Sequence, residues 1–530
     1  MPAPLIAQLQ QTPAAFPHAV PGIECIETHI SWVLLAGEHV YKFKKPLALD
    51  FLDYSTLGLR RAACEEELRI NRRTAPGIYL GVVAVTGTLQ APHLIRAEEV
   101  GADTPVLDWA VHMRRFAQDD LLSHLAQRGA LQPAHIDQLA HHIATFHASA
   151  AVAGTDSPWG RAETMREAVA HNFPDVLTVV AGTALQPTLQ AVQRWSEQQG
   201  EQLAALMAQR HAQGWVRECH GDLHLNNLVL IDGAPQLFDA IEFNPAFRWT
   251  DVLADLAFVL MDLQAHGRAD YAWRLLNAYL EQTGDYSALQ LLPYYQCYRA
   301  MVRAKVAALR WAQLQTQPNS EAAQAVAHHE VDKYLQLAAR LIEPRAVALW
   351  LVSGVSGSGK SRHSQLLIER LGIVRVKADV ERKRLFGLPA LAKSADVVPG
   401  GIYTPEASQR TYARLAALAR DVLFAGLPVL VDATCLKAAQ RHLFMALAQE
   451  LGVPCRILAL DAPVEVLRQR VLHRLAKGAD PSEADVAVLE GQLKAREPLT
   501  AEELACAVQV DTSQPVDWEA VLPVGWIHAD

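Results

Sequence analysis

The segment GVSGSGKS at 354–361 constrains the fold more than any other feature of this chain. It has the form G-x-x-x-x-G-K-S, follows the apolar run AVALWLVS and precedes a helical pattern. Glycines in such a loop let backbone N–H groups turn inward, and the helix that follows directs its positive end at the same point. This order predicts a phosphate-binding loop in a parallel α/β domain. The alternative is a glycine- and serine-rich turn that matches the pattern by chance.

The residues around this loop alternate between strand and helix patterns. Short apolar runs begin near 347, 374, 427 and 455, and helical patterns follow them at 360–371, 406–425, 437–451 and 463–476. Such alternation is typical of βαβ units, which form a parallel sheet with helices on both faces. We therefore expect an α/β domain at 345–513 and a C-terminal tail at 514–530.

The chain before Pro344 has a different pattern. After an N-terminal segment at 1–22, short apolar runs separated by turns predict a sheet-rich lobe at 23–115 that carries one helix. Long helical periods predict a helical lobe at 116–343. The helical pattern stops at Glu343-Pro344-Arg345, which places a domain boundary there. We expect 23–343 to be one bilobal α+β domain.

The composition excludes several classes of protein. The 530 residues are 51% hydrophobic and 20% charged, which is ordinary for a folded multidomain enzyme. A net charge of −9 disfavours a general nucleic-acid or membrane surface. The seven cysteines are scattered without a C-x-x-C pair, and no apolar run reaches the roughly 18 residues that a membrane span needs. We expect a cytoplasmic protein with reduced thiols, no membrane partner and no structural zinc.

The phosphate-binding loop supplies most of one predicted nucleotide site. Lys360 is expected to reach the β- and γ-phosphates of ATP, and the Ser361 hydroxyl to bind Mg²⁺. The whole set of loop residues expected at the nucleotide is Gly354, Val355, Ser356, Gly357, Ser358, Gly359, Lys360 and Ser361.

Two carboxylates follow later strands of the same domain. Asp379 closes VRVKAD, where the carboxyl ends of parallel strands meet the ligand, so it is a candidate base for an attacking hydroxyl. Arg382, one helical turn on, is a candidate anchor for an anionic group. Asp432 ends LPVLVD and is a candidate Mg²⁺ partner. The alternatives are that Asp379 only caps the next helix and that Asp432 is only a turn residue.

Arg470 and Arg474 are four residues apart in PVEVLRQRVLHR and so share a helix face, as a lid over phosphate requires. Arg468 points elsewhere. A solvated basic face is the alternative for this pair. These motifs over about 347–513 resemble the P-loop kinases of the zeta-toxin, polynucleotide 5'-hydroxyl kinase, chloramphenicol phosphotransferase and gluconate kinase group. The resemblance implies ATP and Mg²⁺ as cofactors and leaves the acceptor open.

A second constellation lies upstream, in HGDLHLNN at 220–227 and at Asp239. Asp222, Asn227 and Asp239 have the catalytic order of the protein-kinase-like fold, in which the first takes the proton of the acceptor hydroxyl and the other two hold Mg²⁺. His220 is expected to brace the loop. The pattern H-G-D-x-H-x-x-N resembles the aminoglycoside phosphotransferase and choline kinase branch, which acts on small molecules.

That resemblance implies a strand lysine on the phosphates and a helix glutamate paired to it. Lys42 and Lys44 share a face of VYKFKK, so periodicity cannot separate them. Lys42 is preferred because it lies between apolar neighbours. Among the consecutive Glu65, Glu66 and Glu67, Glu66 is chosen as the partner. The first hairpin turn, ETHIS, contains no glycine and departs from a glycine-rich loop over the phosphates.

The remaining polar residues of this region are expected to be structural. Asp251 can cap the apolar helix that follows it, and Asp255 on that helix is more often an anchor than a catalyst. The histidine pairs at 141–142 and 328–329 are interpreted as solvated.

The sequence therefore predicts an ATP-dependent phosphotransferase with two kinase modules, each acting on a hydroxyl of a small-molecule acceptor. One alternative is a nucleotide-gated regulatory protein that binds without turnover. Another is a nucleic-acid 5'-hydroxyl kinase in the C-terminal half, which the basic run at 382–384 would serve. The sparse aromatic residues there make nucleic acid an improbable partner.

Overall fold

A computed structural model describes residues 2–49, 52–390, 392, 402–477 and 484–522. The chain divides into two compact units: Met1–His266 with Tyr298–Tyr334, and Gly267–Cys297 with Leu335–Asp530. We call them the first and the second unit and describe each by itself. Among the described residues, no helix combines the length and the apolar character that crossing a bilayer requires.

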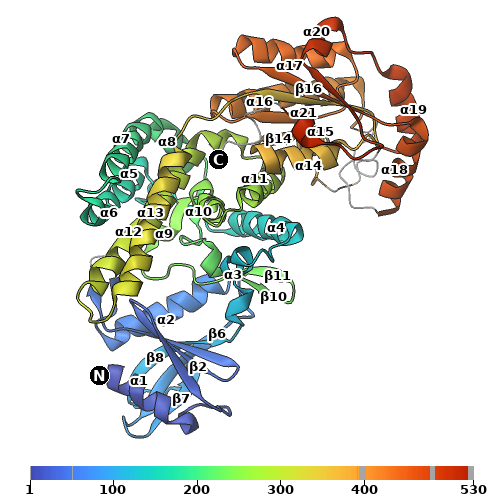
Figure 1. The fold of residues 1–530 in the computed structure, drawn as a ribbon. Coiled ribbons are helices and arrows are strands. Elements are labelled where there is room, and N and C mark those ends of the chain that lie inside the picture. Colours follow the sequence, from blue (N-terminus) through green and yellow to red (C-terminus); the bar gives the residue numbers. More distant parts are fainter. Residues whose placement is uncertain (1, 50–51, 391, 393–401, 478–483, 523–530) are drawn as a thin grey trace. The chain divides into compact units, whose positions relative to one another are not determined.

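The first unit begins with a six-stranded antiparallel sheet of order β1-β2-β3-β8-β6-β7 (Figure 1). Its strands are β1 (Ile23–Glu27), β2 (Ser31–Ala36), β3 (His39–Lys44), β6 (Tyr79–Gly87), β7 (Pro92–Arg96) and β8 (Val106–Arg114). In β3, Tyr41 and Phe43 join the core on one face of the sheet, while Val40 joins the core on the other. The period-two alternation therefore puts Lys42 and Lys44 on the face opposite Tyr41.

One helix packs on each face of this sheet. On the Tyr41 face lies α1 (Pro2–Gln11), which buries Leu5, Ile6 and Leu9 against the strands. On the other face lies α2 (Leu57–Asn71), whose Cys64 joins the opposite core. Thr56 caps α2 by accepting a hydrogen bond from the backbone N–H of Leu59 at 3.2 Å. The sheet-rich lobe with one crossing helix is thus found, and residues before 23 form part of its core.

The rest of the first unit is mainly helical, with short β-pairs that carry the loops of interest. Its helices include α3 (Leu122–Gln127), α4 (Pro133–Ser149), α5 (Ala162–Ala170), α6 (Phe173–Val180), α7 (Gln186–Gln202), α8 (Ala204–Ala212), α9 (Pro245–Arg248) and α10 (Val252–Ala265). Strands β9 (Val216–Glu218) and β12 (Trp249–Asp251) pair antiparallel, as do β10 (Leu228–Ile231) and β11 (Ala234–Leu237). Helices α12 (Leu292–Leu314) and α13 (Glu321–Leu341) complete the unit from Tyr298 to Tyr334.

The second unit is built on a five-stranded parallel sheet of order β14-β15-β13-β16-β17 (Figure 1). The strands are β13 (Leu349–Ser353), β14 (Val374–Lys377), β15 (Val429–Asp432), β16 (Cys455–Asp461) and β17 (Ala507–Asp511). β13, the strand before the phosphate-binding loop, is therefore central, and Val352 pairs with Asp432 in its neighbour. This register puts the carboxyl ends of β13 and β15 side by side, at the same end of the sheet.

Helices cover both faces of this sheet. The helices after β13 in the chain are α14 (Lys360–Leu371), α15 (Ala378–Leu385), α16 (Pro405–Phe424), α17 (Ala438–Glu450), α18 (Val464–Lys477), α19 (Val486–Ala495), α20 (Ala501–Ala505) and α21 (Trp518–Val521). Trp350 and Val352 face a core shared with α14 and with Trp518 of α21. On the other side, α16 contacts β15 and α17 contacts β13. The fold class expected from the alternating pattern is confirmed.

The second unit also contains a segment from before the predicted boundary at 343–345. In it, α11 (Ala269–Thr283) packs on α14 and β14, and the 3₁₀ turn η5 (Tyr286–Leu291) packs on α16. The Asn277 side chain donates to the carbonyl of Ile373 at 3.0 Å and accepts from the N–H of Arg375 at 2.6 Å. The segment thus covers β14, an edge strand that would otherwise expose unpaired backbone groups.

The predicted C-terminal tail at 514–530 is described only up to residue 522, and 523–530 lie outside the described residues. Trp518 in this stretch is 5% exposed and belongs to the core of the second unit.

Candidate functional site

Two lysines of β3 enter a buried charge network in the first unit. Lys42 Nζ lies 2.9 Å from Glu67 Oε1 and 2.5 Å from Asp239 Oδ1. Lys44 Nζ contacts Glu67 and Glu242, and the Tyr54 hydroxyl donates to Glu242 at 2.6 Å. Burial by itself would lower the pKa of Lys42, but Asp239 and Glu67 raise it well above its usual value.

The predicted ion pair between Lys42 and Glu66 is wrong, because Lys42 pairs with Glu67. On α2 the residues that face inward are spaced three or four apart and include Cys64, Glu67 and Asn71. Glu66 lies about 100° around the helix from Glu67. It therefore binds Arg69 at 2.7 Å and Arg248 at 2.5 Å instead.

The loop after β9 brings Asp222 and Asn227 together. The 3₁₀ turn η4 (Leu225–Asn227) bends the chain back, so that Asn227 Nδ2 donates to Asp222 Oδ2 at 2.9 Å and to the Asp222 carbonyl at 2.9 Å. His224 Nε2 lies 3.2 Å from the same carboxylate. Burial would raise the pKa of Asp222, yet His224 lowers it below its usual range. Asp222 is therefore ionised at neutral pH, which is the state in which a carboxylate can accept a proton.

Asp239 has an unusual backbone conformation, with φ of 61°. Positive φ is uncommon in non-glycine residues, and aspartate tolerates it better than most. Its N–H donates to the Tyr79 hydroxyl at 3.0 Å, which fixes the turn against the sheet of the first unit. The carboxylate consequently points at Lys42.

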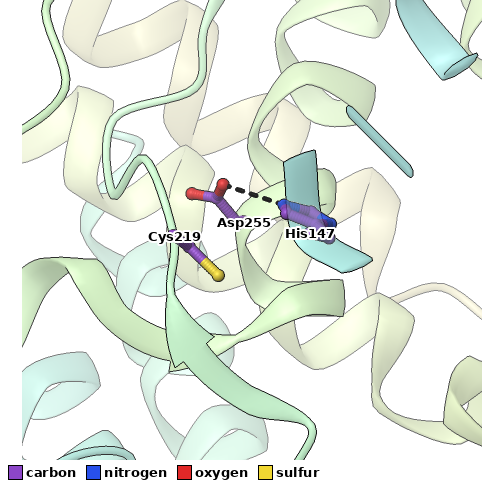
Figure 2. Close-up of side chains that lie close together, drawn as sticks. All are labelled: His147, Cys219 and Asp255. Atoms are coloured by element: carbon purple, nitrogen blue, oxygen red, sulfur yellow. Dashed lines mark hydrogen bonds and ion pairs between the residues drawn. The ribbon is translucent and has the colours of Figure 1, made fainter. Parts of the chain in front are cut away.

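A buried group of side chains, with His147 beside Asp255 (Figure 2), holds the loop that carries Asp222. Asp255 accepts hydrogen bonds from the backbone N–H groups of His220 at 3.1 Å and Gly221 at 2.8 Å, and His147 Nε2 lies 3.2 Å from it. Gly221 is required here, because its φ is 85° and a Cβ would lie 2.8 Å from the Phe247 carbonyl oxygen. The expectation that Asp255 is an anchor agrees with these contacts.

His147, Cys219 and Asp255 have ligand atoms within 4.8 Å of one another, a spacing that could suit a metal ion. However, the Asp255 oxygens already accept from two backbone N–H groups, and the Cys219 thiol donates to the Thr250 carbonyl at 3.6 Å. Burial also raises the pKa of Cys219 well above its usual value, so the thiolate that a metal needs is disfavoured. The cluster is a hydrogen-bonded support of the loop.

In the second unit, the loop at 354–361 joins β13 to α14. Gly357 has φ of 83°, and a Cβ there would lie 2.7 Å from the Leu467 carbonyl oxygen. A Cβ at Gly354 would lie 2.6 Å from the Leu460 carbonyl oxygen. Both positions therefore need glycine, so the pattern is a true close-packed loop rather than a chance turn.

The Lys360 ammonium lies close to other predicted site residues of the second unit. Its Nζ donates to the carbonyls of Gly354 at 3.1 Å and Val355 at 2.9 Å. Burial lowers the pKa of Lys360. Asp432 and Asp379 raise this pKa, and Arg474 lowers it. Asp432, Asp379 and Arg474 thus lie close enough to Lys360 to influence its pKa.

Asp432 and Asp379 differ in how they are held. Asp432 is 5% exposed at the end of β15, and its Oδ2 has no hydrogen-bond partner among the described residues. Asp379 lies inside α15, whose N-cap is Lys377, so it does not cap this helix. Arg382 lies 3.3 Å from Asp379 Oδ1 and over the Tyr403 ring. A bound cation is one partner that would satisfy the buried Oδ2 of Asp432.

Arg470 and Arg474 of α18 donate mainly to backbone carbonyls. Arg470 donates to Thr512 Oγ1 at 2.9 Å, to the Thr512 carbonyl at 2.7 Å and to the Gly357 carbonyl at 3.3 Å. Arg474 donates to the Ala484 carbonyl at 2.6 Å. Arg468 turns away toward Glu490, at 2.5 Å. Arg470 therefore links the end of β17 to the phosphate-binding loop, a contact that spacing did not predict.

Sequence reasoning assigned no role to two members of the first site, Glu242 and His224. His224 was visible as the second histidine of H-G-D-L-H, and Glu242 follows Asp239 by three residues. Strand alternation places Lys44 on the face of Lys42, but it cannot predict the contact of Lys44 with Glu242, which lies 198 positions away in the chain.

Comparisons with known proteins agree with the P-loop assignment. Residues 349–499 match the family model described as an AAA domain. The chain is also 28% identical over 469 residues to the uncharacterized proteins Mb2027c of Mycobacterium bovis and Rv2004c of Mycobacterium tuberculosis, covering 88% of this chain and 90% of each relative. These relatives span both units.

Three solved structures are similar in part. A choline/ethanolamine kinase family protein from Mesorhizobium loti is 14% identical, with a TM-score of 0.37, and covers 63% of this chain and 99% of its own. A sugar kinase from Janibacter sp. is 24% identical, with a TM-score of 0.25, over 32% of this chain and 87% of its own. A gluconokinase from Sinorhizobium meliloti is 24% identical, with a TM-score of 0.24, over 32% and 86%. At such low scores, residue roles rest on the geometry of this chain.

Proposed function

We propose that this chain is an ATP-dependent phosphotransferase with two kinase sites, each of which transfers the γ-phosphate of ATP to a hydroxyl of a small molecule. The single observation that carries the proposal is the position of Lys42 Nζ, 2.9 Å from Glu67 and 2.5 Å from Asp239. A cation between a helix carboxylate and a loop carboxylate is what a protein-kinase-like site uses on the α- and β-phosphates.

In the first unit, Asn227 and Asp239 would hold Mg²⁺, which neutralises phosphate charge when it is bound. Asp222 accepts a hydrogen bond from the acceptor hydroxyl and receives its proton. The Asn227 amide, 2.9 Å from Asp222 Oδ2, fixes the direction of that carboxylate. His224 keeps Asp222 ionised. The residues of this site position the reactants and stabilise the charge on the phosphoryl group during transfer.

In the second unit, the backbone N–H groups of the 354–361 loop and Lys360 would bind the phosphates of ATP. Ser361 and Asp432 would hold Mg²⁺, and the unpartnered Oδ2 of Asp432 supports this role. Asp379 is the proposed base, with Arg382 beside it at 3.3 Å to orient an anionic group. Arg470 and Arg474 supply positive charge near the loop.

The test is to incubate the full chain with ATP, Mg²⁺ and a metabolite extract and to identify phosphorylated products by mass spectrometry. The Asp222→Asn and Asp379→Asn variants should each lose one set of products, and the double variant both. Asp103→Asn, at an exposed turn, is the matched control and should change nothing. Stoichiometric nucleotide binding without acceptor-dependent ADP release would contradict the proposal and favour a regulatory protein.

A further inference from the structure

One peptide unit of the 354–361 loop, the one that joins Val355 to Ser356, is held from both sides by side chains. Its N–H, on Ser356, donates to Gln492 Oε1 at 2.7 Å. Its carbonyl, on Val355, accepts from Lys360 Nζ at 2.9 Å. The N–H and the C=O of a planar trans peptide point in opposite directions. A side chain that fixes the N–H therefore also fixes the direction of the carbonyl.

Helix α19 brings Gln492 to this peptide. Leu489 of α19 lies in one buried cluster with Val355 of the loop and Leu467 of α18. Gln492 follows Leu489 by three residues and so lies on the same face of the helix. Ser356 is buried, and a buried backbone N–H without an acceptor is costly. The packing of α19 on the loop thus supplies the acceptor that the Ser356 N–H needs.

The Val355 carbonyl is one of two that hold the Lys360 ammonium. The other is the Gly354 carbonyl, at 3.1 Å. The Val355 carbonyl also accepts from the N–H of Ser358 at 3.2 Å, which closes the turn of the loop. An ammonium has three N–H donors. Two of those of Lys360 are directed at the loop carbonyls, so these carbonyls set the direction of the third, which remains for a phosphate oxygen.

We propose that Gln492 is a positioning residue for nucleotide binding in the second unit, because it fixes the peptide whose carbonyl aims the Lys360 ammonium. This inference rests on the proposed role of Lys360 at the phosphates of ATP. Gln492 acts through the loop and needs no contact with the nucleotide. Without its amide oxygen, the peptide can rotate to find another acceptor for its N–H, and its carbonyl then leaves Lys360. ATP would then have to order the lysine as it binds, which lowers affinity.

The first experiment tests the link between Gln492 and Lys360 without nucleotide. The full chain is acetylated briefly with acetic anhydride, and peptide mass spectrometry compares Lys360 with Lys494, an exposed residue of α19. Only the neutral amine reacts, and an ammonium that donates to two carbonyls loses its proton less readily. Gln492→Met keeps the length of the side chain and removes the acceptor. It should therefore raise the relative rate at Lys360 about fivefold.

Three further variants separate this role from the packing of α19. Gln492→Glu keeps an acceptor oxygen and should leave Lys360 as slow to react as in the unaltered chain. Glu490→Gln removes the 2.5 Å ion pair of α19 with Arg468 and should also leave that rate unchanged. Should Gln492→Met fail to fold, Gln492→Asn, which is one methylene too short to reach Ser356, takes its place with the same expected acceleration.

The inference is overturned if Lys360 reacts equally fast in the unaltered chain and in Gln492→Met. It is also overturned if Gln492→Glu or Glu490→Gln accelerates the reaction as much as Gln492→Met does.

The second experiment measures nucleotide affinity in the Asp239→Asn chain, in which only the second unit is expected to bind. Calorimetric titration with Mg²⁺ and a non-hydrolysable ATP analogue should show about tenfold weaker binding after Gln492→Met. Gln449→Met, at an exposed position of α17, is the matched control and should keep the affinity. Unchanged affinity in Gln492→Met would overturn the positioning role. An Asp239→Asn chain that binds no analogue would refute the nucleotide site itself, and the acetylation rates tell these two failures apart.

Discussion

Lys42 Nζ and Asp239 Oδ1 lie 2.5 Å apart although 197 residues separate them in the chain. The contact joins the sheet of the first unit to the loop that follows β11. Because Glu67 holds the same ammonium from α2, three elements meet at one charge. This contact defines the first site, and it leads to a prediction that contrasts Glu67 with its neighbour Glu66.

Replacing Glu67 should cost far more than replacing its neighbour Glu66. Glu67→Ala leaves the ammonium groups of Lys42 and Lys44 without a shared partner in a buried place, and breaking such pairs costs about 3–5 kcal/mol. Glu66 has a side chain 29% exposed, so Glu66→Ala should cost about 1 kcal/mol or less. Chemical denaturation of the full chain measures the free energy of unfolding of the first unit in each variant. Equal losses in the two variants would contradict the assignment.

Each nucleotide site should be removable without the other. Lys360→Ala removes a charged donor of the second unit, and Asp239→Asn removes a metal carboxylate of the first. Loss of a hydrogen bond to a charged group weakens binding about tenfold to a hundredfold. A calorimetric titration with Mg²⁺ and a non-hydrolysable ATP analogue should therefore detect two binding sites in the unaltered chain and one in each variant. Two sites retained in Lys360→Ala would refute the assignment of the loop.

Gly357→Ala should abolish nucleotide binding in the second unit. The residue has φ of 83°, and the added Cβ would lie 2.7 Å from the Leu467 carbonyl oxygen, so the loop must open. Gly452→Ala is the control, because its φ of 65° carries similar strain and nothing lies within 4 Å of the new Cβ. Both variants should lose about 1–2 kcal/mol from the left-handed backbone. Only the first should lose affinity for the ATP analogue.

The Asp255 brace should give the first unit an acid-sensitive component of stability. Burial would raise the pKa of Asp255, but the hydrogen bond with His147 lowers it to about 2, from 3.8. Because the folded-state pKa is depressed, the stabilisation is present above the unfolded value and is lost as the pH falls toward 2. It amounts to about 2 kcal/mol at pH 5 and above, and about 1 kcal/mol of it is gone at pH 3.

The measurement is the difference in unfolding free energy between the unaltered chain and Asp255→Asn at those two pH values. The difference should shrink by about 1 kcal/mol at the lower pH. A pH-independent difference would mean that the carboxylate is not the ionised acceptor of the His220 and Gly221 N–H groups.

The sequence determined much of this protein because several of its signals are local. The glycine spacing of 354–361 and the apolar run before it predicted the strand, loop and helix that form there, and α14 spans the residues expected. The order of Asp222, Asn227 and Asp239 predicted one site, since these residues lie on loops adjacent in the chain. Strand alternation correctly placed Lys42 and Lys44 on one face.

Only the tertiary structure decided which of the consecutive glutamates meets Lys42. The choice of Glu67 depends on the rotation of α2 against the sheet, on which α2 packs through Cys64 and through the buried ion pair of Arg60 with Asp108 of β8. In the same way, the cover of β14 by α11 joins residues almost a hundred positions apart, such as Asn277 and Ile373. A local pattern carries no information about such pairs, because the free energy that selects them is the burial of surfaces distant in the chain.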